Sequence, residues 1–116
     1  MKIRVAVGSS DGKYINQHFG HAQKFLIFDI EAINYEYIET RSNLPSCNEG
    51  DHTSGSLEST LNILKDVDIV LVSQIGPGAS QYLLDNGIKP FIMPGFIDEE
   101  LTKLAKNLTH KEVEFN

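Results

Sequence analysis

The chain has 116 residues, 41% of them hydrophobic, with a formal net charge of −6 and a pI of about 5.1. This length fits one core, so we expect a single domain over residues 1–116. The acidic chain lacks the basic footprint of a nucleic-acid-binding protein, and no apolar run approaches the roughly 20 residues that span a bilayer. Residues 1–5 lead into a strand pattern rather than a signal peptide, and the single cysteine suits a reducing compartment. We therefore expect a cytoplasmic protein that binds neither nucleic acid nor membrane.

Three strands are predicted in the first part of the chain. Residues 3–7 form an apolar run that ends at Gly8, and residues 24–30 form a second run. Residues 35–40 form the third strand, which must run antiparallel to the second because residues 31–34 make so short a connection. The segment from Gly8 to Lys13 differs from a nucleotide P-loop in its glycine spacing and lacks the serine or threonine that binds magnesium.

The loop between the first two strands contains two histidines three residues apart, His18 and His21. If this loop turns helically, both imidazoles lie on one face and can hold a soft or metallic ligand. Phe19 would anchor the loop beneath them, and Gly20 would allow a tight turn or the close approach of a ligand. The alternative is that Phe19 fills the core while both histidines are ordinary surface residues.

Residues 43–55 form a second loop of interest, because they contain almost no apolar side chains. Long loops inside compact domains are usually functional or mobile. This loop carries the only cysteine, Cys47, and a third histidine, His52, at a spacing unlike the tight cysteine pairs of structural zinc sites. The alternative for the loop with Cys47 and His52 is a disordered polar segment.

The remaining elements alternate between helix and strand. Leucines at helical spacing predict a helix from about residue 57, followed by a buried strand over 68–72. Gly76, Pro77 and Gly78 form a glycine-rich turn before a second helix, which ends near residue 86. A last strand covers 88–93, and a final helix begins at Asp98. We expect residues 110–116 to be a frayed tail.

This order, βββαβαβα, predicts an α/β fold with a mixed five-stranded sheet in the order 3-2-1-4-5, flanked by about three helices. This layout resembles that of a ribonuclease H-like three-layer fold. The loops after strands 1, 3 and 4 should then leave the same edge of the sheet, and open α/β sheets bind ligands at the carboxyl ends of parallel strands. The turn from Gly76 to Gly78 would aim backbone N–H groups and a positive helix end into that crevice.

Imidazole, thiolate and anion-binding amides at one edge suit an iron–sulfur species. One cysteine rules out a four-cysteine cluster within a monomer, but a preassembled cluster docked by one to three ligands is compatible with His18, Cys47 and His52 as metal ligands. A ribonuclease H-like hydrolase would need a carboxylate within the first strand, where only Asp11 at its end is available. A simple metal site or an interaction module without cofactor is the other alternative.

Three stretches carry a family resemblance: residues 5–12, the segment Ile15–Ala22 with its His-Phe-Gly core, and residues 25–30. The similarity continues through 68–71, 75–79 and 84–89. The chain resembles the dinitrogenase iron–molybdenum cofactor biosynthesis family, which includes NifX-type and NafY-type carriers and the carboxyl-terminal domain of the NifB type. The resemblance implies a ribonuclease H-like fold, with His18 at the position of the cofactor-associated histidine.

The resemblance further implies a non-enzymatic carrier of an iron–sulfur or iron–molybdenum-type cluster, whose partners are a cluster donor and an acceptor protein. We expect a monomer or weak homodimer. Several relatives carry more histidine or cysteine in the variable loop than Cys47 and His52. The chain also lacks the Cys-x-x-x-Cys-x-x-Cys motif of the radical-SAM part of NifB-type proteins, so it offers no cluster synthesis.

Overall fold

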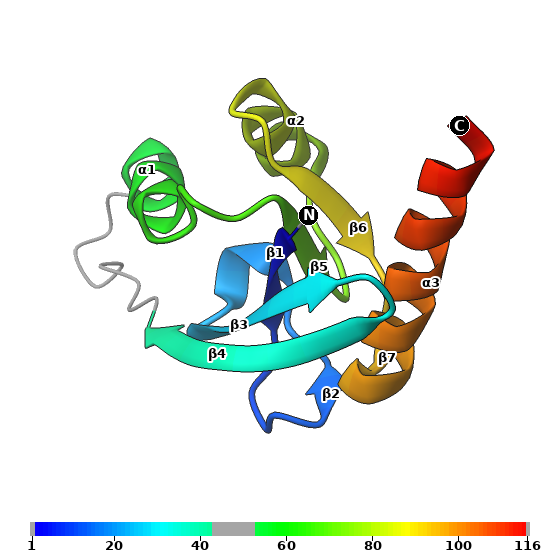
Figure 1. The fold of residues 1–116 in the computed structure, drawn as a ribbon. Coiled ribbons are helices and arrows are strands. Elements are labelled where there is room, and N and C mark those ends of the chain that lie inside the picture. The colour runs from blue at the N-terminus through cyan, green and yellow to red at the C-terminus, as the bar shows by residue number, and fades with distance from the viewer. Residues whose placement is uncertain (1, 43–52, 116) are drawn as a thin grey trace.

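A mixed five-stranded sheet organises the computed structural model, which describes residues 2–42 and 53–115 (Figure 1). Its strands lie in the order β4-β3-β1-β5-β6. This is the predicted order 3-2-1-4-5 when the five strands of this sheet are numbered along the chain. The strand bounds are Lys2–Gly8 for β1, Lys24–Glu31 for β3, Asn34–Ser42 for β4, Ile69–Val72 for β5 and Lys89–Ile92 for β6.

The strand directions decide which loops meet. Strand β3 runs antiparallel to both β1 and β4, whereas β1, β5 and β6 are parallel to one another. The carboxyl ends of β1, β4 and β5 therefore lie at one edge of the sheet, as the chain order predicts. The connections that leave this edge begin at residues 9, 43 and 73.

Helices cover both faces of the sheet, which gives the fold three layers (Figure 1). Helices α1 (Thr53–Ile63) and α2 (Pro77–Asp85) lie on one side, and α3 (Ile97–Phe115) lies on the other. A separate apolar core fills the space on each side. Within β1, Val5 and Val7 belong to the core under α3, while Ala6 faces the core under α1 and α2. This alternation follows from the two-residue period of a strand.

Two features of the fold differ from the sequence prediction. A small second sheet joins β2 (Tyr14–Ile15) to β7 (Gly95–Phe96), and strands of two residues are too short to leave a periodic pattern. Helix α3 continues to Phe115, through most of residues 110–116, for which a frayed tail is predicted. No helix within the described ranges is long and apolar enough to cross a membrane.

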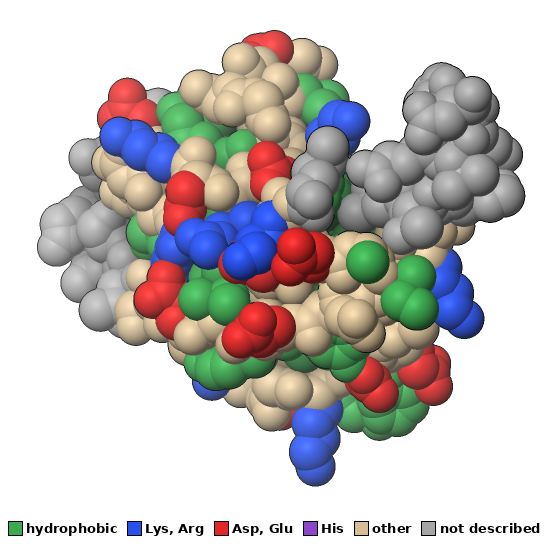
Figure 2. Space-filling model, in the orientation of Figure 1, with side chains coloured by type: hydrophobic (Ala, Val, Ile, Leu, Met, Phe, Trp, Pro, Cys, Tyr) green, Lys and Arg blue, Asp and Glu red, His purple; other side chains and the backbone are tan. Residues whose placement is uncertain are grey.

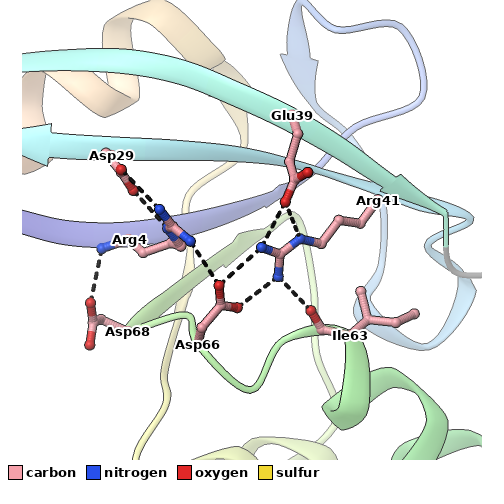
Figure 3. Close-up of polar contacts among 7 residues, drawn as sticks. All are labelled: Arg4, Asp29, Glu39, Arg41, Ile63, Asp66 and Asp68. Atoms are coloured by element: carbon pink, nitrogen blue, oxygen red, sulfur yellow. Dashed lines mark hydrogen bonds and ion pairs between the residues drawn. The ribbon is translucent and has the colours of Figure 1, made fainter.

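A charged network ties α1 to the sheet (Figure 3). Arg4 on β1 faces Asp29 directly across the strand pair, with Nε 2.8 Å from Oδ1, and also binds Asp66 at 2.8 Å. Arg41 on β4 binds Asp66 and donates to the Ile63 carbonyl, both at 2.7 Å. Hydrogen bonds from Arg41 hold the pKa of Asp66 well below its usual range, and those from Arg4 lower the pKa of Asp29. The network thus joins β1, β3, β4 and the turn after α1.

Acidic and basic side chains gather together on the face drawn in Figure 2, and no described histidine is visible on it. The histidine loop therefore lies on another side of the molecule.

Candidate functional site

The histidine loop is fixed to the end of β5 by backbone hydrogen bonds. The amide of Gln17 donates to Gly8 at 3.3 Å, and its carbonyl accepts from Ser73 at 3.0 Å. The amide of Phe19 donates to the carbonyl of Gln74 at 2.8 Å, and His18 and Gln74 form an isolated parallel bridge. The loop therefore continues the parallel pairing of β1 and β5 beyond the edge of the sheet.

Phe19 anchors the loop in the core under α1 and α2. Its side chain is 3% exposed and its ring centroid lies 5.9 Å from that of Phe25. Phe19 therefore lies in the core, as both the predicted anchor and its alternative require. It also leaves the neighbouring histidines no room on the inner side, so both point outward.

His18 and His21 share one face of a short helical turn, as predicted. A 3₁₀ helix (η1) covers Phe19–His21 with His18 as its N-cap, and the His21 amide donates to the His18 carbonyl at 3.0 Å. The two imidazole rings are stacked, with centroids 6.0 Å apart and planes within 18°. Both side chains are exposed and available to a ligand.

A cavity of about 280 Å³ lies between this turn and the chain that follows β5. Its walls come from the histidine loop and from residues 74–76. The lining residues are His18, Phe19, Gly20, His21, Gln74, Ile75 and Gly76. The predicted meeting of the His18 loop with Gly76 is therefore present, whereas Gly78 is not among the residues that line the cavity.

The two glycines of the cavity have no conformational reason to be glycine. The backbone does turn tightly at Gly20, in the 3₁₀ helix, but without a positive φ that would require glycine. A Cβ added at Gly20 or Gly76 would meet no atom within 4 Å. Each glycine instead leaves bare backbone facing open space, which suits the close approach of a ligand.

Helix α2 begins at this cavity. Gly76 is its N-cap in an extended conformation without a side-chain cap, and Pro77 follows as the first helical residue. The N-terminal end of a helix carries a partial positive charge and amides without intrahelical partners. Since Gly76 lines the cavity, the positive end of α2 lies at the cavity, which favours an anion there.

The predicted ligands Cys47 and His52 lie outside the described residues. The strand that precedes them, β4, ends at the same edge of the sheet as β1 and β5. Within residues 2–42 and 53–115, no group of three or more histidine, cysteine, aspartate or glutamate side chains is arranged to hold a metal ion. The potential ligand groups in the described part of the site are thus two imidazoles and backbone groups.

Two lining residues were not predicted, Gln74 and Ile75. The signal that could have identified them is their place directly after a buried parallel strand, at the edge where ligands bind. Neither side chain is a usual metal ligand, so the residue types alone do not indicate a role in binding.

Asp11, the only acid available to a hydrolase at the end of β1, is engaged by its own loop. Its carboxylate accepts the amides of Lys13 at 2.9 Å and Tyr14 at 3.0 Å, together with the Ser9 hydroxyl at 3.3 Å. The hydrogen bond from Tyr14, followed by that from Lys13, lowers the pKa of Asp11. These contacts give Asp11 the role of a turn-forming residue.

Comparison with protein families agrees with this geometry. The family model described as dinitrogenase iron-molybdenum cofactor matches residues 1–107. The chain belongs to this family. The match covers both walls of the cavity and all five strands of the main sheet.

Curated proteins similar to this family member are named FeMo cofactor biosynthesis protein NifB. The protein from Frankia alni is 31% identical over 109 residues, which cover 91% of this chain and 21% of that protein. The protein from Azotobacter vinelandii is 37% identical over 92 residues, covering 76% and 18%. This chain therefore spans about a fifth of the length of these relatives.

Solved structures share the fold of this family member. The crystal structure of PH0822 has a TM-score of 0.72 at 23% identity, covering 90% of this chain and 92% of that one. A candidate dinitrogenase from Methanocaldococcus jannaschii has a TM-score of 0.63 at 16% identity, covering 92% and 91%. At these identities the likeness concerns the fold alone.

Proposed function

We propose that this chain is a non-enzymatic carrier, which binds an iron–sulfur cofactor or its precursor in the cavity beside His18 and passes it to an acceptor protein. The observation that carries the proposal is the pairing of two exposed imidazoles with bare glycine backbone around one cavity. Membership in the iron–molybdenum cofactor family supports this choice of cargo. A role in nitrogenase-type cofactor assembly follows from the same membership.

The chemistry of the cavity suits such a cargo. Imidazole nitrogen is a ligand for iron, and the helix end at Gly76 favours the negative charge of an iron–sulfur species. The Phe19 anchor holds the histidine turn in place, so little ordering is needed at the moment of binding. Cys47 and His52 remain proposed additional ligands, and Gly78 remains a proposed contact in the first turn of α2.

The proposal extends to partners, because a carried cluster needs a source and a destination. We assign a cluster donor and a cluster acceptor to this role, with the carrier acting as a monomer or weak homodimer. The much longer NifB relatives contain further segments that this chain does not match. The three layers and the mixed sheet also support the ribonuclease H-like designation, which remains a proposal.

Anaerobic reconstitution tests the carrier role. The purified chain is incubated with ferrous iron, sulfide and thiol, passed over a gel-filtration column, and analysed for iron, sulfide and visible absorption. Wild type is expected to retain iron and sulfide together, and His18→Ala to lose most of both. The control is Lys106→Ala. Lys106 is an exposed residue of α3, the helix on the other side of the sheet from α1 and α2, so this variant should retain iron and sulfide as wild type does.

Two results would contradict the proposal. Equal retention of iron by wild type and His18→Ala would show that the imidazole does not hold the cargo. Stoichiometric zinc without sulfide in the natively purified protein would indicate a simple metal site instead.

A further inference from the structure

A second cavity, of about 320 Å³, lies at the start of α3 on the face of the sheet that this helix covers. Three aromatic residues and two charged residues line it: Phe28 on β3, Tyr35 on β4, Phe96 on β7, Lys13 and Asp98. Its volume is at the lower end of the range of about 300–1,000 Å³ that is usual for ligand sites. The cavity therefore has room for one side chain or one small ligand, and it shares no lining residue with the histidine cavity.

Aromatic rings border this cavity from two sides and stay partly in water. Tyr14 and Phe96 face each other across β2 and β7, and their rings stack with centroids 4.5 Å apart. These two side chains are 42% and 44% exposed. On β3 and β4, Phe28 contacts Tyr35 and the exposed Tyr37 edge-on, at centroid distances of 5.9 and 5.7 Å. The fold gains little by leaving such rings in water, so their exposure here favours a binding surface.

Two carboxylates lie at or beside the same cavity. Asp98 is exposed and accepts a hydrogen bond from the hydroxyl of Tyr35. The carboxylate of Asp11 accepts the amides of Lys13 and Tyr14, which places it beside the segment that forms one wall. Within the described ranges neither carboxylate forms an ion pair, so both are available to a cation from outside.

The charge balance around the cavity is negative. The first turn of α3 carries acidic residues at 98, 99 and 100, which more than offset the partial positive charge of about half a unit at a helix N-terminus. Of these, Glu100 is paired with Lys103 at 3.4 Å. Among the described residues that line the cavity, Lys13 alone is basic, and it opposes at least two carboxylates. The cavity should therefore attract a cation and repel an anion.

Aromatic rings and carboxylates together are the chemistry that recognises a cation. A guanidinium group stacks on the faces of tyrosine and phenylalanine within about 6 Å and forms bidentate hydrogen bonds with a carboxylate. We propose that this cavity is a docking site for an arginine side chain of a partner protein. Arginine fits better than lysine, because its planar group is more weakly hydrated and stacks on rings. Free arginine fits less well, because its own carboxylate would meet Asp11 and Asp98.

The place of the cavity in the fold suits a partner protein as the occupant. Residues 12–14 and the histidine turn belong to the same connection between β1 and β3, so a partner held here lies beside the edge of the sheet that carries the histidine cavity. The net charge of −6 also steers a basic partner toward this chain. The inference stands apart from the carrier function, because the two cavities have no lining residue in common.

An NMR titration of the ¹⁵N-labelled chain, without cargo, tests the inference. The probe is arginine with acetyl and methylamide caps. Citrulline with the same caps is the matched neutral probe of nearly the same shape, capped leucine is the apolar probe, and free arginine is the small-molecule probe. Chemical shifts of the backbone amides at residues 12–14 and 96–98 report binding at the cavity, and those at residues 18–21 report binding at the histidine turn.

Capped arginine should shift the amides at the cavity, and capped citrulline and leucine should bind more weakly. Phe96→Leu keeps an apolar side chain without a ring face, and Asp98→Asn removes one negative charge. Each should weaken arginine binding about two- to fivefold, the loss of one exposed cation–π contact or ion pair. Lys13→Gln removes the opposing charge and should bind at least as tightly as wild type. Glu58→Gln removes an exposed negative charge on α1 and should match wild type.

Four outcomes would overturn the inference, and none of them bears on the carrier function. Equal binding of capped arginine and citrulline would show that the cavity recognises no charge. Tighter binding of capped leucine would make it an apolar docking surface, and tighter binding of free arginine would make it a small-molecule site. Absence of any shift at residues 12–14 and 96–98 would show that the cavity binds none of these groups. Circular dichroism of each variant verifies that the fold is kept.

Discussion

Neighbouring residues of the histidine turn have opposite environments. Phe19 is buried at 3% exposure, whereas His18, Gly20 and His21 are exposed. The buried ring holds the turn to the core, and the exposed residues line the cavity. Stability and binding therefore depend on different residues of the same short segment, and single substitutions should separate them.

Phe19→Ala should destabilise the fold strongly. Removal of a fully packed phenylalanine leaves a cavity, and such changes cost about 3–5 kcal/mol. Urea unfolding of the protein without cargo would measure this loss. His18→Ala, one residue earlier and exposed, should lie within about 0.5 kcal/mol of wild type. Equal losses in the two variants would contradict the assignment of Phe19 as the anchor.

Gly20→Ala should stabilise the fold and weaken cargo binding. Alanine fits the backbone at this position, and such replacements gain about 0.4–1 kcal/mol by reducing the entropy of the unfolded chain. The added methyl group would occupy the space in which the cargo is proposed to lie. Gly12→Ala is the matched control, because Gly12 has φ +75° and the same change should destabilise. Undiminished cluster uptake by Gly20→Ala would show that the cargo does not approach this backbone.

At the scale of elements, the charged network decides how α1 lies against the sheet. Arg41 on β4 reaches both the last carbonyl of α1 at Ile63 and the carboxylate of Asp66 (Figure 3). The side chain of Asp66 is 48% exposed, so solvent screens these ion pairs considerably. Their contribution comes from the shared geometry of several charges rather than from one strong pair.

Asp66→Asn should remove a stabilisation that depends on pH. The pKa of Asp66 is lowered in the folded state by Arg41, so its contribution is present at neutral pH and is lost as the pH falls below about 4, the ordinary carboxyl range. We expect the variant to be about 1 kcal/mol less stable at pH 7. The difference in the free energy of unfolding between Asp66→Asn and wild type should be smaller near pH 2. Urea unfolding at both pH values measures this difference, and Glu58→Gln on α1 is the exposed control. A difference in the free energy of unfolding that is the same at both pH values would contradict the network's role.

The elements that carry long apolar runs were predictable, and the shorter ones were not. The runs over 3–7 and 24–30 gave the strands at the centre of the sheet, because only buried strands need so many consecutive apolar residues. A charged residue, Arg4 or Asp29, interrupts each run. The alternation of side chains along a strand could have indicated that both lie on one face of the sheet, where they face each other. The pairing of β2 with β7 joins residues far apart in the chain and has no local signal.

At the scale of the whole molecule, the site is a consequence of strand direction. The turn at His18 and the turn at Gly76 come together because β1 and β5 are parallel neighbours. This meeting could be predicted from the chain order, since helical crossovers make strands parallel. The stacking of the two imidazoles could not, because it depends on the side-chain torsions of two exposed residues. The ligand roles of Cys47 and His52 stay predictions.

Binding at this edge should stabilise the entire fold. A ligand that binds only the folded state raises the free energy of unfolding, by about 2.7 kcal/mol at a hundredfold excess over its dissociation constant. Anaerobic urea unfolding with and without a synthetic iron–sulfur cluster should show this increase for wild type. His18→Ala should show much less of it. An equal increase in both proteins would place the bound cluster away from the cavity.

The central claim is that an imidazole of the histidine turn bonds directly to the metal cargo. The most direct measurement is pulsed electron paramagnetic resonance of the cluster-loaded chain, labelled with ¹⁵N-histidine and reduced to a paramagnetic state. We predict a ¹⁵N hyperfine coupling of a directly bonded imidazole, which is lost in His18→Ala and kept in Lys106→Ala. A loaded cluster that shows no such coupling, or a coupling that persists in His18→Ala, would contradict the claim.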